Sequence, residues 1–133
     1  MVVLDPAAGF GATDAAVASV TSFRYTQLLI DSEMNMSYQG QSYENITDSR
    51  YFSGGSSALA WLCLRLALHS RLSLTNALPL ILDEATVYFD DNRLRLMMSE
   101  LEALSEQGKQ IIILSASDRE LKFLKNASIT ELS

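Results

Sequence analysis

The sequence has 133 residues, of which 48% are apolar, and this fits one compact α/β domain with a substantial core. Ten lysine and arginine residues against sixteen aspartate and glutamate residues give a net charge of −6, which argues against a free-standing nucleic-acid-binding domain with a basic face. Its apolar stretches are shorter than the roughly 20 residues of a membrane span, and no secretory signal pattern is present. The only cysteine, Cys63, lies in an apolar run, so we expect its side chain to be buried in the core. A single cysteine cannot form a disulfide within the chain, which fits a protein of the reducing cytosol.

The N-terminal segment carries little periodic pattern. Residues 1–12 include one proline and two glycines and predict a loosely structured leader. The stretch Thr13–Val20 predicts a short helix, with Thr13 or Asp14 as its N-cap. We therefore separate residues 1–22, a leader and a short helix, from a main domain at residues 23–133.

Antiparallel strands are expected next. The run Phe23–Asp31 is rich in residues that favour strands. Met34, Met36 and Tyr38 then alternate with polar residues, and a Gln-Gly-Gln turn leads into Ser42–Ile46. This pattern predicts an antiparallel hairpin or meander.

From Phe52 onward, helices and buried strands are expected to alternate. The stretch Ser57–Leu74 is apolar on almost its whole circumference, which predicts a buried helix with His69 at the surface near its end. The short apolar run Pro79–Leu82 predicts a strand of a parallel sheet that is covered on both faces.

The last third predicts a second helix followed by a second parallel strand. The helix is expected between an N-cap at Asp90 or Asp91 and a stop at Gly108, with an amphipathic stripe of Leu94, Met97, Met98, Leu101 and Leu104. The run Gln110–Leu114 predicts a second buried strand, and hence a right-handed parallel βαβ unit. A short helix at Asp118–Lys125 and a last strand at Ser128–Leu132 complete the expected α/β fold.

Two segments of this pattern have the residue types of a phosphate site. Ser53-Gly54-Gly55 stands at the start of a helix, where glycines let the backbone approach a ligand and unpaired N–H groups attract phosphate. The alternative is a plain turn with a serine cap. Asp83 and Glu84 end a buried strand, where open α/β sheets place their ligands, so Asp83 suits Mg²⁺ and Glu84 suits polarising a water molecule. The alternative is an acidic pair that faces solvent.

The order and spacing of these segments resemble an ABC-type ATPase head of the SMC/SbcC-like family. Ser53-Gly54-Gly55 before a helix that contains Leu64-Arg65-Leu66-Ala67-Leu68 looks like the signature motif. Pro79–Asn92 is similar to the Walker B strand and the D-loop, and Gln110–Ser115 resembles the strand that leads to the switch loop. The resemblance covers roughly residues 20–133 and implies the C-terminal half of a P-loop NTPase-like head.

The resemblance implies a role for each matching residue. Ser53, Gly54 and Gly55 would bind the γ-phosphate of ATP held by an opposing head, Asp83 would support Mg²⁺, and Glu84 would be the catalytic base. Asp90 would cross the dimer interface in the D-loop. Such a site needs positioning and charge neutralisation more than covalent chemistry, so ATP would join two heads and hydrolysis would release them.

Two features depart from the family pattern. The sequence contains no G-x-x-x-x-G-K-[ST] loop, which implies that this chain is the C-terminal half alone and that ATP hydrolysis needs a separate Walker A half, either of the same protein or of a split partner. The switch-loop histidine is also absent, and Ala116 or Ser117 takes its position.

These departures leave alternatives open. The first is an ATP-hydrolysing head segment in DNA repair or chromosome maintenance, which works as a homodimer of heads, reaches DNA and a nuclease through the full assembly, and resides in the cytoplasm or at the nucleoid. The second is a catalytically weakened ABC-like domain that dimerises on nucleotide without efficient hydrolysis. A third is an unrelated small α/β domain, which requires these motif matches to be coincidental.

Overall fold

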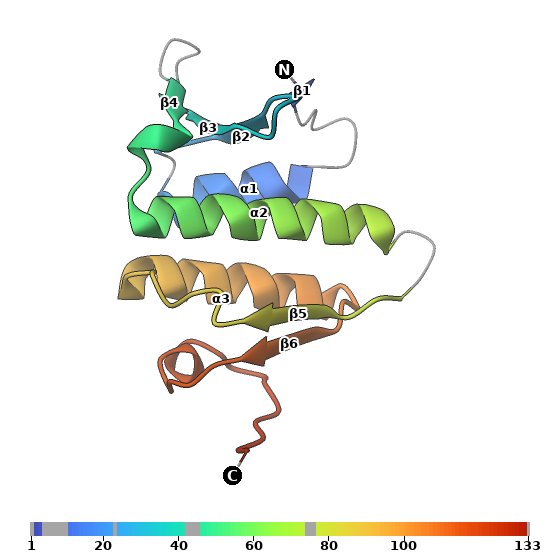
Figure 1. Ribbon diagram of the computed structural model, residues 1–133. Helices are drawn as coiled ribbons and strands as arrows, with labels where there is room; N and C mark the ends of the chain where they lie inside the picture. The colour runs from blue at the N-terminus through green and yellow to red at the C-terminus, as the bar shows by residue number, and fades with distance from the viewer. Residues whose placement is uncertain (1, 4–10, 23, 42–45, 74–76, 133) are drawn as a thin grey trace.

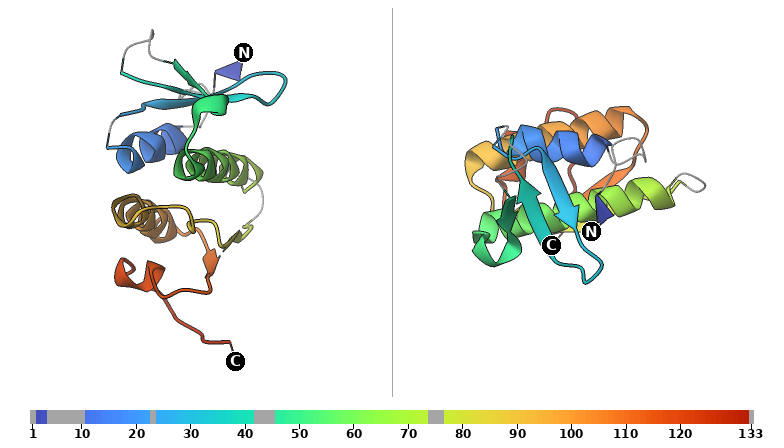
Figure 2. Two further views of the ribbon diagram at one scale, coloured as in Figure 1. Left: turned by 60° about the vertical axis from the view of Figure 1, so that its left-hand side comes forward. Right: turned by 90° about the horizontal axis from the view of Figure 1, so that it is seen from above.

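The computed structural model of the chain describes residues 2–3, 11–22, 24–41, 46–73 and 77–132. Its elements are, in chain order, β1 (Val2–Val3), α1 (Gly11–Val20), β2 (Gln27–Ile30), β3 (Met36–Gln39), β4 (Ile46–Asp48), the 3₁₀ turn η2 (Ser49–Tyr51), α2 (Gly54–Leu72), β5 (Leu80–Asp83), α3 (Asp91–Glu106), β6 (Ile111–Leu114) and the 3₁₀ turn η3 (Glu120–Lys122). An antiparallel sheet and a parallel strand pair lie on opposite sides of the three helices (Figures 1 and 2). No helix of the described residues has the length and apolar character needed to cross a membrane.

The first sheet has the strand order β1-β2-β3-β4, and all its neighbours are antiparallel. The predicted meander is thus confirmed, although β2 is shorter than Phe23–Asp31 and β4 begins at Ile46. Phe23 and residues 42–45 lie outside the described residues. The expectation of a loosely structured leader is wrong for Val2–Val3, which pair with Ile30 and Leu29. So short a strand exists only through its distant partner, which leaves no local signal in the sequence.

Helix α1 confirms the predicted short helix but begins earlier than expected. Because it starts at Gly11, Thr13 and Asp14 lie inside its first turns, and the prediction that either is the N-cap is wrong. The helix packs against both α2 and α3, and its residues Ala16, Val17 and Val20 are buried. Residues 4–10 lie outside the described residues.

Helix α2 confirms the predicted long apolar helix but is not buried on every side. Leu59, Leu62 and Cys63 are at most 3% exposed, whereas Trp61 and Leu68 are more than half exposed. One apolar stripe of this helix is therefore uncovered, and the expectation of complete burial is wrong for this chain. His69, in the last turn, is partly buried and its Nε2 lies 2.8 Å from the carbonyl oxygen of Leu78.

The β5–α3–β6 unit confirms the predicted parallel pair, with Leu80 opposite Ile111 and Asp83 opposite Leu114. The α3 stripe is buried at Leu94, Met97, Met98 and Leu101 and packs with Leu80 and Leu82 in the core. The opposite face of the strands is open, since Ile81, Ile112 and Leu114 are 52%, 38% and 42% exposed. The prediction that both faces are covered is therefore wrong within the described residues.

The end of the chain is less regular than predicted. Only the three residues of η3 form a helical turn within Asp118–Lys125, and Ser128–Leu132 form no strand. The carboxylate of Glu102 on α3 accepts the backbone N–H groups of Lys125 (2.5 Å) and Asn126 (3.2 Å). A side chain rather than a sheet edge thus holds the start of this tail.

Candidate functional site

The predicted site residues gather at one edge of the molecule. The N-termini of α2 and α3, the carboxyl ends of β5 and β6, and η3 all lie on the left-hand side of Figure 1. Loops at the carboxyl ends of parallel strands are where open α/β folds place their ligands. The sequence motifs therefore converge on one region, although they span more than sixty positions from Ser53 to Ser117.

The Ser53-Gly54-Gly55 turn starts helix α2, as predicted. Ser53 is its N-cap in extended conformation, and its Oγ accepts the backbone N–H of Ser56 at 3.1 Å. The alternative interpretation of Ser53 as a helix cap is thus part of its role in this chain. Gly54 and Gly55 occupy the first turn, and an anion is favoured at the N-terminus of a helix.

Gly55 packs against the segment that the sequence matched to the D-loop. A Cβ atom at Gly55 would lie 2.9 Å from the carbonyl oxygen of Tyr88 and 2.8 Å from Nη1 of Arg93, whereas at Gly54 the nearest atom would be 4.0 Å away. Only glycine permits this approach without a backbone shift. The turn Ser53–Gly55, which we call the signature turn, and the loop before α3 are therefore in direct contact within one chain.

The antiparallel sheet supports the signature turn from behind. The buried Tyr38 of β3 donates its hydroxyl to the carbonyl oxygen of Ser56 at 2.7 Å. Its ring stacks on Tyr25 and contacts Phe52 at centroid distances of 4.8 and 4.5 Å. Burial raises the pKa of Tyr38, so it remains a donor across the physiological range.

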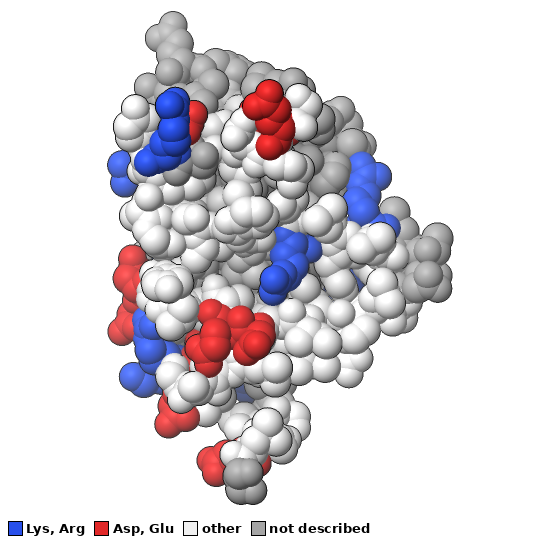
Figure 3. Space-filling view, viewed as in Figure 1, with Lys and Arg blue, Asp and Glu red and all other residues white. Residues whose placement is uncertain are grey.

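Asp83 and Glu84 follow the buried residues of β5 and are both exposed at the end of the strand. The backbone of Glu84 has a φ of +48°, a left-handed conformation that is unusual for a residue other than glycine. Its N–H donates to the carbonyl oxygen of Leu114, and its carboxylate Oε1 accepts the backbone N–H of Ala116 at 2.5 Å. A compact acidic group is visible near the end of β5 on the face shown in Figure 3.

The switch-loop position after β6 thus meets Glu84 through its backbone. Ala116 and Ser117 are exposed, and the N–H of Ala116 is the group that contacts the Glu84 carboxylate. Ser117 instead turns toward its own loop, since its N–H donates to Ser115 Oγ at 3.1 Å. Asp90 also acts locally, because it is the N-cap of α3 and accepts the N–H of Arg93 at 2.7 Å.

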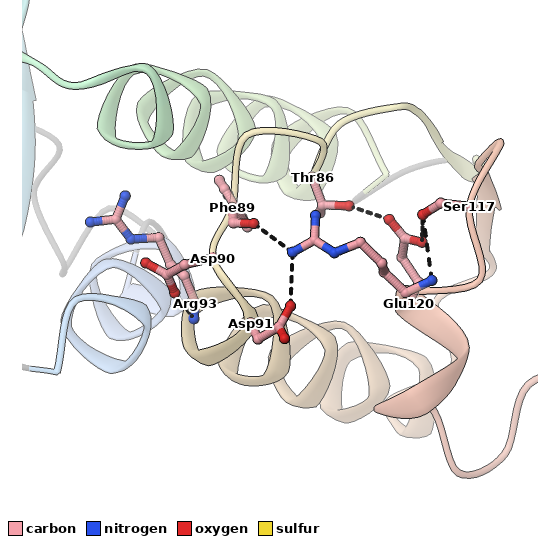
Figure 4. Close-up of polar contacts among 8 residues, drawn as sticks. Thr86, Phe89, Asp90, Asp91, Arg93, Ser117 and Glu120 are labelled. Atoms are coloured by element: carbon pink, nitrogen blue, oxygen red, sulfur yellow. Dashed lines mark hydrogen bonds and ion pairs between the residues drawn. The ribbon is translucent and has the colours of Figure 1, made fainter.

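Three further residues that the sequence did not point to join these loops. The buried side chains of Thr86 and Glu120 are bonded at 2.8 Å, and Figure 4 shows Glu120 between Thr86 and Ser117. Arg119 donates to the carbonyl oxygen of Phe89 at 2.7 Å and to Asp91 at 3.0 Å. A lone acidic residue in a short charged segment gives no sequence signal of burial, so only the fold reveals this cluster.

Burial alone would raise the pKa of the Glu120 carboxyl by penalising its charged form. Hydrogen bonds from Thr86, from its own backbone and from the hydroxyls of Ser115 and Ser117 outweigh this effect, and the pKa of Glu120 lies below its ordinary value. The group is therefore an ionised, fully bonded acceptor at neutral pH, which is what makes a buried carboxylate tolerable.

One side chain at this edge, the carboxylate of Asp83, is of the kind that binds Mg²⁺. Magnesium in nucleotide sites is held by one or two carboxylates together with phosphate oxygens and water, and the exposed Asp83 carboxylate is one such donor. No cluster of three His, Cys, Asp or Glu side chains able to hold a metal occurs among the residues that the structure describes. The described part of the chain thus offers the Asp83 carboxylate as one donor of the kind that Mg²⁺ takes.

Comparison with known proteins gives a family model and several similar structures. The model described as "SbcC/RAD50-like, Walker B motif" matches residues 18–103. No curated protein matches at a significant level. Among solved structures, one from work on ATP-driven dimerisation and DNA-stimulated activation of SMC ATPases has a TM-score of 0.63 at 16% identity and covers 93% of this chain and 81% of its own.

Two further similar structures are SMC heads bound to domains of ScpA. A head bound to the C-terminal winged-helix domain of ScpA has a TM-score of 0.62 at 17% identity, with 86% of this chain and 36% of that chain covered. A Pyrococcus furiosus head with an extended coiled coil, bound to the C-terminal domain of ScpA, has a TM-score of 0.58 at 17% identity, with 86% and 29% covered. This chain thus spans about a third of these two structures and shares the fold of the corresponding part of a P-loop NTPase head.

Proposed function

Since this chain belongs to the SbcC/RAD50-like Walker B family, we propose that it is the ATP-hydrolysing C-terminal segment of an SMC/SbcC-like head. In this proposal it completes a composite ATP site with a separate Walker A half and with an opposing head. The observation that carries the proposal is the hydrogen bond between Glu84, at the end of β5, and the N–H of Ala116, beyond β6. It brings together the segments matched to Walker B and to the switch loop.

The proposed roles follow from what each side chain can do at this edge. Glu84 is the base that orients the attacking water, because its carboxylate is exposed and held by a single backbone donor. Asp83, beside it, supplies a carboxylate to Mg²⁺, which would neutralise charge on the transferred phosphoryl group. The first turn of α2 offers the N–H groups of Gly54 and Gly55 to the γ-phosphate of ATP on the opposing head. The hydroxyl of Ser53, which here donates to Ser56 Oγ at 3.0 Å, would turn toward the same phosphate.

The open face of the parallel strands supports the proposed Walker A partner. Ile81, Ile112 and Leu114 form an exposed apolar surface on strands that are otherwise part of the core. An uncovered sheet face of this kind normally packs against another layer. We place the P-loop-bearing half of the same protein, or a split partner, on this face.

The loop before α3 supports contact with an opposing head. Val87 and Tyr88 are 52% and 72% exposed, and the backbone of Tyr88 lies against Gly55 of the signature turn. In a dimer of heads these side chains would meet the other subunit next to the shared nucleotide. Asp90 contributes to this contact mainly by fixing the start of α3.

The wider assignment follows the family. We propose a role in DNA repair or chromosome maintenance, in the cytoplasm or at the nucleoid, with DNA and a nuclease reached through the full assembly and its coiled coil. The net charge of −6 is consistent with DNA contact through the assembly, because this chain carries no excess of basic residues for binding DNA by itself.

A second candidate function is nucleotide-dependent dimerisation without efficient hydrolysis. Ala116 and Ser117 stand where the family places histidine, and the contact between the switch loop and Glu84 is made by a backbone N–H. A backbone donor cannot act as a titrating side chain or reach toward the γ-phosphate as an imidazole does. This observation favours slow turnover over loss of nucleotide binding.

The experiment that tests both candidates combines this chain with its Walker A half and compares wild type with Glu84→Gln. Glutamine keeps an oxygen acceptor for the N–H of Ala116 but cannot serve as a base. Turnover by wild type and an ATP-locked dimer of Glu84→Gln would support the hydrolytic head. Dimerisation of wild type on ATP without turnover would support the second candidate, and absence of any nucleotide response would reject both.

A further inference from the structure

The buried carboxylate of Glu120 bridges the two segments that form the hydrogen bond to Glu84. Its Oε1 accepts the hydroxyl of Thr86 at 2.8 Å, and Thr86 stands two positions after Glu84. Its Oε2 accepts the hydroxyls of Ser115 at 3.0 Å and Ser117 at 3.3 Å, the two neighbours of Ala116. One carboxylate therefore contacts the extension of β5 on one side and both flanks of Ala116 on the other. Figure 4 shows its contacts with Thr86 and Ser117.

The Thr86 and Glu120 part of this cluster is buried. Glu120 is 6% exposed and Thr86 is 3% exposed, so water cannot replace their hydrogen bond at low cost. By contrast, Ala116 and Glu84 are both exposed. Their mutual contact has no burial to maintain it and depends on how the two segments are held. The hydrogen bonds of Glu120, anchored by its buried bond to Thr86, supply that restraint.

We propose that Glu120 is a positioning residue for the reaction proposed above. It fixes the position of the loop 115–117, so that the backbone N–H of Ala116 can donate to the carboxylate of Glu84 and hold it in place. Thr86 is its partner on the Walker B side. The neighbouring Arg119 ties the same turn to the D-loop through the carbonyl oxygen of Phe89 and the carboxylate of Asp91. The expected effect of Glu120 on kcat rests on the proposed function, whereas its effect on the position of the loop 115–117 does not.

The kinetic test uses the chain assembled with its Walker A half. Glu120→Ala should lower kcat for ATP about 10- to 100-fold, because a displaced catalytic group loses this much, while KM for ATP changes by less than about twofold. Glu120→Gln should recover most of the loss, since its amide can face the serine hydroxyls and its oxygen can accept from Thr86. Thr86→Val should resemble Glu120→Ala, and Thr86→Ser should resemble wild type.

A second readout is independent of activity. In NMR spectra of the chain, the amide proton of Ala116 should resonate downfield because it donates to a carboxylate at 2.5 Å. Glu84→Gln should shift this resonance, and Glu120→Ala and Thr86→Val should move it toward the position of an unbonded amide. Glu102→Ala is the matched control, because Glu102 also accepts two backbone N–H groups but lies outside the site.

The outcomes separate the two levels of the proposal. If Glu120→Ala and Thr86→Val leave both kcat and the Ala116 resonance unchanged, the positioning role is overturned. If these variants lower kcat only as much as Glu102→Ala does, the effect is general destabilisation and the role is also overturned. If wild type neither binds nor hydrolyses ATP, the proposed function fails, and the Ala116 resonance still decides whether Glu120 sets the loop. Should Glu120→Ala not fold, Thr86→Val and Thr86→Ser carry the test.

Discussion

The two signature glycines provide a matched pair of substitutions with opposite expected effects. Gly54→Ala and Gly55→Ala both add one methyl group to the first turn of α2, and both lower the entropy of the unfolded chain equally. At Gly54 the new Cβ meets its nearest atom at 4.0 Å, an ordinary contact. At Gly55 it meets the carbonyl oxygen of Tyr88 at 2.9 Å, closer than a carbon and an oxygen can approach without a shift.

The difference in the free energy of unfolding between the two variants depends on which neighbouring atoms can move away from the new Cβ. The second close neighbour at Gly55, the guanidinium of Arg93, is the flexible end of a side chain and can move away. The carbonyl oxygen of Tyr88 belongs to the loop that Asp90 caps onto α3, so it resists displacement. Overpacking of this kind costs about 1–3 kcal/mol. Gly54→Ala should instead be neutral or stabilising by up to about 1 kcal/mol.

Urea denaturation of the two variants measures this difference directly. The midpoint of Gly55→Ala should lie about 0.5–2 M below that of Gly54→Ala, given a slope of about 2 kcal/mol per M of urea. ATP-dependent dimerisation should also suffer more in Gly55→Ala, because the D-loop has moved. Equal midpoints for the two variants would refute the close contact between the signature turn and the loop before α3.

Three further predictions address the cap, the buried carboxylate and the open sheet face. Asp90→Ala removes the N-cap of α3 and should destabilise the chain by about 1 kcal/mol, whereas Asp118→Ala, at an exposed position with no helix to cap, should change little in the same urea titration. The pKa of Glu120 is lowered in the folded chain, so its contribution to stability is present above its unfolded pKa and is lost as the pH falls through its folded pKa. Between about pH 5 and pH 3 the free energy of unfolding of wild type should therefore fall more steeply than that of Glu120→Gln, and parallel curves would contradict this account. Ile112→Ser should leave the stability of the chain nearly unchanged but weaken binding of the Walker A half by about tenfold or more, while Ile129→Ser, in the exposed tail, should leave that affinity intact in a titration by calorimetry.

The parts of the fold that sequence predicted well are those that local chemistry determines. Helix α3 was expected from its stripe of Leu94 to Leu104, from an aspartate cap and from Gly108, and each feature acts within a few residues of the helix. The strands β5 and β6 were likewise expected from short apolar runs. Periodicity and caps depend on neighbours in the chain, which a sequence displays directly.

The expectations that failed concern contacts between distant segments. The strand at Val2–Val3 depends on β2, and the openness of Trp61 and Ile81 depends on what covers them, which an apolar pattern cannot specify. Among the candidate site residues, Ser53, Asp83, Glu84 and Asp90 were predicted because motif spacing marks them. Glu120 was missed because its burial arises from contact with Thr86, thirty-four positions away.

The most direct test of the composite site is to mix two inactive heads. Ser53→Arg disables the signature turn and Glu84→Gln disables the base, so each variant, assembled with its Walker A half, should hydrolyse little ATP alone. If each site joins the Glu84 of one head to the Ser53 turn of the other, heads mixed before ATP is added will form dimers with one intact site. We expect activity well above the sum of the two variants. A mixture no more active than that sum would contradict it.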